Sequence, residues 1–332
     1  MGLVAGVGAV LVSLIVIRHG AAKPVLFLAG LWLAYLSSSR LGRLRFGERF
    51  RLSFVLSAAW LGLIAVAALL ADVLPLSEAQ DSSRTITVAG NLTPDLLSPH
   101  PLGTNNQGLD LLARGVYGAR VSLLVVGVAV SIALVCGAVV GIAAGYYRGG
   151  VDRTVTFLTD VILAVPALLF LVALGAIWGK PTSVGEAVVK LGLGLGVVMM
   201  PTVVRLARGN TIGVAQREFI AAAKVLGVRD RRIMRCEVLP NVVTPLLAYA
   251  FVLASIIIFA EGTLSFLGLG LQAPKPSWGS MIAESGTREL DEHPQIVVVP
   301  GVLMLLTVCS LSQVGEHLRL RWLGLGRSWW RG

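Results

Sequence analysis

Residues 217–241 read REFIAAAKVLGVRDRRIMRCEVLPN, a polar and arginine-rich stretch inside an otherwise apolar chain. The alanine-rich run from Glu218 to Leu226 predicts a short helix, because alanine has the highest helix propensity of all residues. Gly227 predicts a break in that helix, and a second short helix is expected before the apolar run that follows Leu239. A basic helix-turn-helix between two apolar runs is poorly suited to catalysis, but it is well suited to be bound by another protein.

Composition identifies the class of protein. The 332 residues are 55% hydrophobic and only 14% charged, whereas soluble proteins carry about 25% charged residues. Apolar runs of about 20 residues, each long enough to cross a bilayer as a helix, recur along the chain. We therefore predict an all-α polytopic membrane protein. Its net charge of +10 is ascribed to membrane orientation and not to nucleic-acid binding, because the basic residues gather in particular loops.

Six apolar runs form the predicted spanning core. They cover residues 52–71, 121–145, 154–178, 187–206, 242–260 and 296–314. Two shorter runs precede them, from Leu3 to Ile17 and from Pro24 to Leu36. Each is near or below the length of a spanning helix, so two alternatives stay open: an extra tight hairpin across the membrane, or segments that lie partly in the interface.

The distribution of Lys and Arg predicts the orientation. Nineteen of the 28 basic residues lie in four segments, residues 40–51, 148–153, 205–240 and 316–332. The loops 72–120 and 261–295 hold only five basic residues and ten acids. Because cytoplasmic loops of membrane proteins carry the excess of Lys and Arg, residues 217–241 and the C-terminus are predicted to be cytoplasmic. The two acidic loops are then extracytoplasmic.

Several residues inside the spans predict local geometry. Gly137, Gly141 and Gly145 recur at every fourth residue and place three flat spots on one helix face, where another backbone can approach closely. Pro166 predicts a kink within the span 154–178. The alternating Leu/Gly run 191–196 has the period of a strand, but a lone strand in lipid leaves its backbone groups unpaired, so a helix is predicted there.

Catalytic and metal-binding motifs are missing from the sequence. The string from Gly175 to Pro181 is one residue short of a P-loop and has Pro where Ser or Thr should coordinate magnesium. The four histidines and three cysteines have no metal-ligand spacing, and no G-x-S-x-G occurs. We predict that the chain is not an enzyme and that it holds no cofactor, no metal and no catalytic residue.

Two acidic residues in or beside the spans allow two interpretations each. Asp160 either belongs to a transport pathway or orients helices by pairing with Arg153 or Arg205. We favour the second, because a proton pathway needs more than one such group. Glu261, at the outer end of its span, either touches substrate or serves the structure. We favour a structural role, on the ground that it can reach water there.

An ordered set of motifs adds to these observations. They are HPLGT (100–104), GLD (108–110), YGARVSL (117–123), AGYY (144–147), VDR (151–153), Asp160 with Pro166, E-x-x-A-A-x4-G (218–227) with LPN (239–241), EGTLSFLGLG (261–270) and PSWG (276–279). The set, over roughly residues 98–318, resembles the C-type permease of the dipeptide, oligopeptide and nickel family of ABC (ATP-binding cassette) importers. One motif alone is weak, since alanine-rich helices are common, but the ordered set is highly specific.

The resemblance implies a six-helix type I importer permease core in the bacterial cytoplasmic membrane. The expected domains are an N-terminal apolar hairpin (1–39), a first core span with its extracytoplasmic loop (40–115), the permease domain (116–318) and a basic cytoplasmic tail (319–332). The implied function is ATP-driven uptake of a small polar ligand, either a di- or oligopeptide or a related ligand such as a nickel chelate.

The resemblance also implies partners and a coupling site. The partners are a second homologous permease subunit in a heterodimer, two cytoplasmic ATP-binding subunits, an extracytoplasmic substrate-binding protein and the lipid bilayer. The ATPase-coupling residues would be Glu218, Ala221, Ala222, Gly227, Arg231, Glu237, Leu239 and Pro240.

Three positions depart from the family pattern. Asn105 stands where the family has Asp and Leu109 where it has Arg, which puts a specific role of the outer loop in doubt. Glu237 stands where the family has His, which bears on contacts to the ATPase. The alternative class is a secondary transporter or channel-like protein that works without ATP. It predicts several ion- or proton-coupling acids inside the spans, and their near absence counts against it.

Overall fold

The computed structural model describes residues 52–95, 97–284 and 292–328, with side chains as far as Arg321. Contacts divide the chain into two units, Met1–Ala59 and Trp60–Gly332. Of the first unit, only the start of helix α3 (Leu52–Leu69) is described, so the packing below is that of the second unit. The predicted N-terminal hairpin, residues 1–39, lies outside the described residues.

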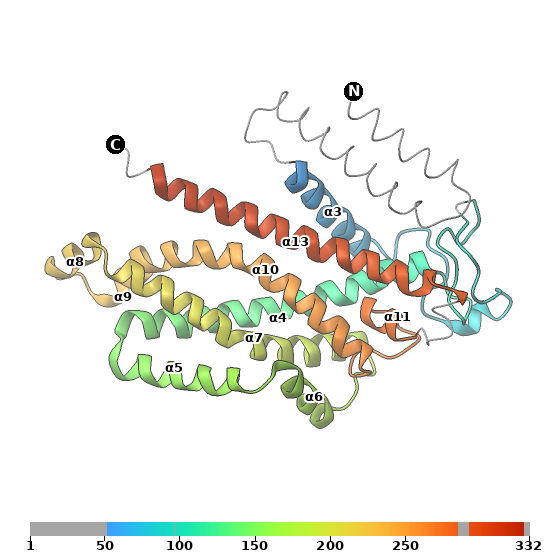
Figure 1. Ribbon diagram of the computed structural model, residues 1–332, viewed down its shortest axis with the longest axis horizontal. Coiled ribbons are helices and arrows are strands. Elements are labelled where there is room, and N and C mark those ends of the chain that lie inside the picture. Colours follow the sequence, from blue (N-terminus) through green and yellow to red (C-terminus); the bar gives the residue numbers. More distant parts are fainter. Residues whose placement is uncertain (1–51, 96, 285–291, 329–332) are drawn as a thin grey trace. The chain divides into compact units, whose positions relative to one another are not determined.

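Helices build the second unit (Figure 1). After α3 they are η1 (Ser82–Thr85), α4 (Leu111–Tyr147), α5 (Gly149–Ala164), α6 (Ala167–Trp178), α7 (Val184–Ala215), α8 (Glu218–Val225), α9 (Asp230–Ile233), η2 (Met234–Val238), α10 (Leu239–Phe266), α11 (Trp278–Glu284) and α13 (Gln295–Ser328). Over the described ranges no β-strand is formed, which confirms the prediction of an all-α protein.

Five described helices are long and apolar enough to cross a membrane: α3, α4, α7, α10 together with the turns before it, and α13. A sixth span results only if α5 and α6 count as one, and these are bent by 82°. The break falls at the predicted proline: Val165 is extended and Pro166 is the N-cap of α6. A residue before proline is driven out of the helical region. A bend of this size makes two helices of the span that the sequence predicted as one kinked helix.

Helix α4 begins earlier than predicted. It starts at Leu111, ten residues before the expected span, and Asp110 caps it by accepting a hydrogen bond of 2.7 Å from the N–H of Ala113. From the sequence, these residues were expected in the acidic loop 72–120, which also contains Arg114 and Arg120. The structure instead pairs both arginines with acids of the outer segments. At the other end of the chain, α13 likewise continues past the predicted span to Ser328.

Helices α4 and α7 pack with their backbones close together. A Cβ atom on Gly141 would lie 2.5 Å from the carbonyl oxygen of Val204, and one on Gly145 would lie 2.7 Å from that of Arg208. Gly192 and Gly196 of α7 make the same kind of approach to α4, within 2.8–3.0 Å of its valine and isoleucine side chains. The predicted close approach along the glycine face is thus confirmed, and the Leu/Gly run 191–196 lies within helix α7.

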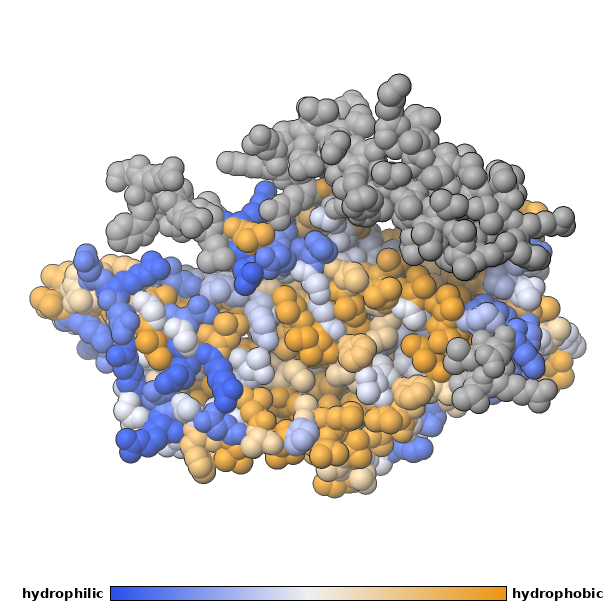
Figure 2. Space-filling view, viewed as in Figure 1, coloured by the Kyte–Doolittle hydropathy of each residue, from blue (hydrophilic) through white to orange (hydrophobic). Residues whose placement is uncertain are grey.

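The apolar core lies between α4, α7, α10 and the inner face of α13. Figure 2 shows apolar side chains over the middle of the helices and hydrophilic side chains at the end that carries α8 and α9. Helix α11 lies at the opposite end (Figure 1). The end that carries α8 and α9 therefore differs in character from the middle, as expected of a protein that crosses a bilayer.

Candidate functional site

The segment 217–241 forms a turn at one end of the helices. Helix α8 is followed by Gly227, whose φ is +76°, and α9 then runs through the π-helical turn η2 into α10. The first helix and the glycine break follow the prediction. The second helix is not a separate one, because the helical backbone continues from Asp230 to Phe266 as one run of 37 residues.

Gly227 closes α8 with a left-handed C-cap. Its N–H donates to the carbonyl of Lys224 at 3.0 Å, and the N–H of Val228 donates to the carbonyl of Ala223 at 3.1 Å. A Cβ at this glycine would meet nothing within 4 Å. The backbone angle, and not lack of space, is therefore what requires glycine here.

The segment has one buried face and one exposed face. Ile220 and Ile233 are 1% exposed and Val238 is fully buried, and all three join the apolar core. On the outside, Val225 is 87% exposed and Leu226 is 81% exposed. Two neighbouring apolar side chains left open at the end of a short helix, beside charged residues, are typical of a protein interaction site.

The predicted coupling residues fall into two groups. Glu218, Ala221 and Ala222 are exposed on α8, and Arg231 is exposed on α9. Glu237 is half-buried in η2, and its carbonyl accepts a hydrogen bond of 2.6 Å from the side chain of Asn241. Leu239 and Pro240 are exposed in the first turn of α10. The first group is exposed on the two short helices, whereas the second lies where the segment joins α10.

Sequence analysis missed the contact that holds this segment from the side. The Tyr146 hydroxyl, at the end of α4, donates a hydrogen bond of 2.6 Å to Asp230 of α9. The Lys224 ammonium of α8 lies 5.0 Å from the centroid of the same ring. Tyr146 entered the sequence analysis only as part of the AGYY motif. A tyrosine at the end of a predicted span, whose hydroxyl needs a partner if it is buried, was the available indication.

Asp160 forms an ion pair with Arg205, one of the two partners that the helix-orienting interpretation named. The Arg205 guanidinium of α7 lies 2.5 Å from its carboxylate on α5. A second pair between these helices joins Asp152 to Arg208, whose Nε and Nη2 atoms donate to the two carboxylate oxygens. Asp160 and Arg205 remain about half exposed, 53% and 54%, so the pair lies at the surface of this subunit.

Glu261 is buried, and the expectation that it reaches water is wrong. It is 1% exposed. The Ser122 hydroxyl of α4 and the Ser265 hydroxyl of α10 each donate a hydrogen bond of 2.9 Å to its carboxylate. The cause is the extension of α10 to Phe266 and the packing of α11 over it: Gly279 of α11 approaches so closely that a Cβ there would lie 2.7 Å from the backbone of Gly262.

A buried ion pair joins the loop before α4, the loop after α10 and α11 to helix α4. Arg114 is 1% exposed in its side chain and makes two bonds of 2.6 Å to Glu284 of α11. It also donates to the carbonyls of Ala79 and Pro274. Burying a charge requires such full pairing. Arg114 thus fastens the loop before α4, the loop after α10 and helix α11 to one point.

The two outer-loop departures have structural roles beside this ion pair. The side-chain carbonyl of Asn105 accepts hydrogen bonds of 3.0 Å and 2.9 Å from the N–H groups of Gln107 and Leu109. Its amide nitrogen lies 3.5 Å from Glu284, where the carboxylate of an Asp would meet a like charge. Leu109 is fully buried, so this position serves the packing of the loop.

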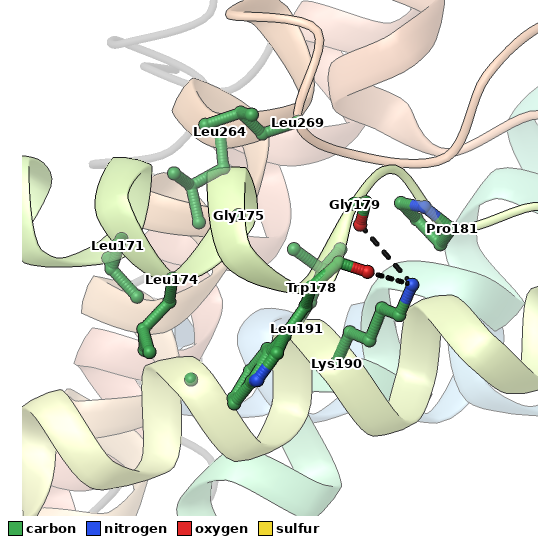
Figure 3. Close-up of a pocket in the computed structure, with 11 residues that line it drawn as sticks. Leu171, Leu174, Gly175, Trp178, Gly179, Pro181, Lys190, Leu191, Leu264 and Leu269 are labelled. Atoms are coloured by element: carbon green, nitrogen blue, oxygen red, sulfur yellow. Dashed lines mark hydrogen bonds between the residues drawn. The ribbon is translucent and has the colours of Figure 1, made fainter.

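A small cavity of about 20 Å³ lies between α6, α7 and the end of α10. Leucines and Trp178 line most of it, and Figure 3 shows Lys190 reaching past Trp178 towards the end of α6. The Lys190 ammonium donates to the carbonyls of Trp178 and Gly179 at 2.6 Å and 3.3 Å and pairs with Glu186. A single water molecule needs about 10–15 Å³ on this measure, so the cavity is too small for a peptide.

Comparison with known proteins gives a consistent result. Residues 137–321 match the family of binding-protein-dependent transport system inner membrane components. The dipeptide transport system permease protein DppC of Alkalihalophilus pseudofirmus is 36% identical over 66% of this chain and 70% of the relative. The di/tripeptide permease DppC of Pseudomonas aeruginosa is 35% identical over 66% and 70%. The glutathione transport system permease protein GsiD of Pectobacterium atrosepticum is 31% identical over 67% and 71%.

The family match, the run of apolar helices and the exposed segment between two spans agree with one another. The chain belongs to the family of binding-protein-dependent transport system inner membrane components, and it is a multi-pass permease subunit of an ABC importer.

Proposed function

We propose that this permease takes up small peptides, which a substrate-binding protein delivers from outside. The support for the cargo comes from the relatives, whose names specify dipeptides, di- and tripeptides, and glutathione. Glutathione is itself a tripeptide, so all three ligands share amide, amine and carboxylate groups. We propose further that this chain forms one half of a permease heterodimer and that ATP hydrolysis takes place in two separate subunits.

The observation that carries the coupling role is the exposed end of α8. Val225 and Leu226 stand open beside the small side chains of Ala221 and Ala222. Burying one Val or Leu side chain contributes about 1.5–3 kcal/mol, so a partner with an apolar cleft would gain substantially from covering this end. The small alanines allow that partner to approach the helix closely. We infer that α8 docks into such a cleft on a cytoplasmic ATP-binding subunit.

Charges around α8 fit the rim of that contact. Arg229, Arg231, Arg232 and Arg235 are all exposed between α8 and α10, and Glu218 is exposed at the start of α8. Arginines at a docking surface form strong, charge-assisted hydrogen bonds to carboxylates. The cleft on the ATP-binding subunit is therefore expected to carry acidic residues at its edge. Glu237 is half-buried at the base of the segment. This Glu, which stands where the family has His, would therefore change the position of the segment more than the docking surface itself.

Nucleotide binding by this chain is disfavoured by the place of its nearest P-loop-like string. A P-loop precedes a helix and presents backbone N–H groups to phosphate. Here Gly175 lies inside α6, and the N–H of Gly179 bonds to the carbonyl of Gly175 at the end of that helix. The end of a helix presents carbonyl groups, which repel phosphate. This supports placing ATP in the partner subunits.

We propose that α8, α9 and the C-terminus face the cytoplasm and that the segment 72–110 with α11 faces outside, in line with the distribution of basic residues. The permease domain then begins with α4 at Leu111, five residues before the boundary expected from the motifs. Helices α5 and α7, with their half-exposed ion pair, form part of the surface next to the second permease.

The test uses the complete importer in proteoliposomes, with its binding protein and labelled dialanine as cargo. Gly227→Val forces a β-branched residue into a positive φ and should lower ATP-driven uptake by at least about tenfold, as expected when a docking contact loses more than 1.4 kcal/mol. Glu218→Lys should weaken retention of the ATP-binding subunit. Gly62→Val is the matched control, because a Cβ at Gly62 meets nothing within 4 Å.

Amounts in the membrane should stay equal in all variants. Uptake at the wild-type rate in both Gly227→Val and Glu218→Lys would refute the coupling role. A purified chain that transports dialanine without any ATP-binding subunit would favour a secondary transporter.

A further inference from the structure

Tyr146 contacts both helices of the segment that we call the coupling segment, residues 217–241. Its hydroxyl donates to Asp230 of α9 at 2.6 Å, a length typical of a hydrogen bond to a charged acceptor. The Lys224 ammonium of α8 lies 5.0 Å from its ring centroid, within the range of a cation–π contact. One side chain of α4 thus holds one charge from each of the two short helices.

The position of Tyr146 is itself fixed. Its side chain is 8% exposed. The preceding residue, Gly145, lies so close to α7 that a Cβ there would be 2.8 Å from Thr211. The last turn of α4 is therefore packed tightly against α7. Asp230 is exposed, but the hydroxyl that it binds comes from a ring with a set place.

The coupling segment has two covalent connections and this lateral one. Through the chain it joins α7 before Arg217 and α10 after Val238. The polar contacts of Tyr146 join it to α4, a helix of 37 residues with a length of about 55 Å at 1.5 Å per residue. At the other end of α4, the carbonyl of Gly115 accepts a hydrogen bond of 3.0 Å from Trp278 of α11. The same helix therefore contacts the coupling segment at one end and the outer segments at the other.

We propose that Tyr146 is a positioning residue that fixes the orientation of the coupling segment relative to α4, so that a displacement of the segment moves α4 as well. This inference rests on the coupling role proposed above. A competing explanation is that the buried Ile220 and Ile233 hold the segment without help. It predicts that removing the hydroxyl changes neither the order of the segment nor the use of ATP.

The matched pair of variants is Tyr146→Phe and Tyr147→Phe. Both remove one hydroxyl from neighbouring tyrosines, but Tyr147 is 51% exposed and only Tyr146 binds Asp230. A second pair acts on the acceptor: Asp230→Ala removes it, whereas Asp230→Asn keeps an oxygen that can accept the bond. If the importer with Tyr146→Phe does not assemble, the comparison of Asp230→Ala with Asp230→Asn tests the role of the Tyr146–Asp230 bond.

Two measurements are made on the complete importer. Hydrogen–deuterium exchange of residues 218–233 needs neither cargo nor ATP, and we expect it to become at least about tenfold faster in Tyr146→Phe and Asp230→Ala. The number of ATP molecules hydrolysed per dialanine taken up should rise at least about fivefold in the same variants, because closure of the ATPase no longer moves α4. Tyr147→Phe should match the wild type, and Asp230→Asn should lie near it. The ATP-binding subunits should still co-purify.

Unchanged exchange and an unchanged ATP ratio in Tyr146→Phe and Asp230→Ala would overturn the proposal in favour of the isoleucine contacts. Equal changes of exchange and ATP ratio in Tyr147→Phe would also overturn it, because removing any hydroxyl at this end of α4 would then have the same effect. If the wild-type importer does not move dialanine, the proposed cargo fails. In that case the exchange measurement alone decides the role of Tyr146.

Discussion

Ser122 of α4 and Glu261 of α10 are joined by a buried hydrogen bond of 2.9 Å, and Ser265 binds the other carboxylate oxygen at the same distance. Glu261→Ala should leave the Ser122 hydroxyl without its partner and leave Ser265 only its 3.5 Å contact with the Ser277 hydroxyl. A buried polar group left without a partner costs about 1–3 kcal/mol. We expect a lower thermal unfolding temperature of the purified permease. The unfolding temperature of Glu261→Gln should lie between those of Glu261→Ala and the wild type.

Thr263→Ala is the control for that variant. Thr263 lies two residues further along α10, and its hydroxyl bonds back to the carbonyl of Phe259. This change should leave the unfolding temperature near that of the wild type. An equal decrease in Thr263→Ala and Glu261→Ala would contradict the role of the Ser122–Glu261 bond.

The ion pair between Arg114 and Glu284 should show strong coupling. Glu284→Met leaves a buried guanidinium without its carboxylate, and breaking a buried pair costs about 3–5 kcal/mol. The double variant Arg114→Met with Glu284→Met removes both charges and should be less destabilised than Glu284→Met alone. Denaturant unfolding of the four proteins of this cycle measures the effect. Simple addition of the two single effects would contradict it.

Close packing of α4 on α7 predicts a contrast between two glycines of one helix. Gly141→Val should disrupt the pair of helices and lower the amount of folded permease, because even a Cβ at Gly141 would lie 2.5 Å from a backbone oxygen. At Gly127 a Cβ meets nothing within 4 Å, so Gly127→Val should be tolerated. Size-exclusion chromatography of detergent extracts distinguishes them. Equal yields would show that α7 can move away from α4.

Exchanging the charges of Asp160 and Arg205 separates its two interpretations. If the pair only orients α5 and α7, Asp160→Arg should impair uptake and the swap Asp160→Arg with Arg205→Asp should restore it, since the attraction is kept. If cargo contacts the pair, the swap should stay impaired while the permease folds normally. Uptake of dialanine, normalised to folded permease, measures the difference.

Glu78 makes the outer loop sensitive to acid. Hydrogen bonds from the backbone N–H groups of Gln80, Asp81 and Ala79, together with the nearby charge of Arg84, hold the pKa of its carboxyl below the usual value. A lowered pKa means that the carboxylate stabilises the loop fully above the unfolded pKa of about 4.3. That contribution is lost as the pH falls through the folded pKa. Proteolysis of residues 72–110 should therefore accelerate below about pH 4, and Glu78→Gln should reduce this acceleration. Part of it should remain, because hydrogen bonds from Ser83 also lower the pKa of Asp81 in the same loop.

Local sequence patterns predicted the membrane-embedded part well. The spacing of Gly137, Gly141 and Gly145 was enough to predict the close contact of two helices, and Pro166 marked the break between α5 and α6. Both depend on a single residue type with one dominant physical effect, a missing side chain or a missing N–H. The size of the bend between α5 and α6 depends on the helices that pack around it, and residues near Pro166 in the sequence do not specify that packing.

Charged residues were predicted less well. Glu261 was expected to reach water at the outer end of its span, and no partner was predicted for Arg114, although an isolated charge is costly to bury. Their partners, Glu284 and Ser122, lie 170 and 139 residues away in the chain. Tyr146 and Asp230 were missed for the same reason, with 84 residues between them. Such pairs become visible only when the helices are assembled.

The π-helical turn η2 gives the coupling segment two connections of unequal stiffness. On one side, α7 ends and α8 starts anew after Arg217. On the other, α9 passes through η2 into α10 without interruption. A movement of the segment would therefore be transmitted to α10 through continuous helix and would rotate α10 about its axis. The break between α7 and α8 can bend instead, so less of the movement would reach α7. Of the two spans that flank the segment, α10 would be the one that rotates.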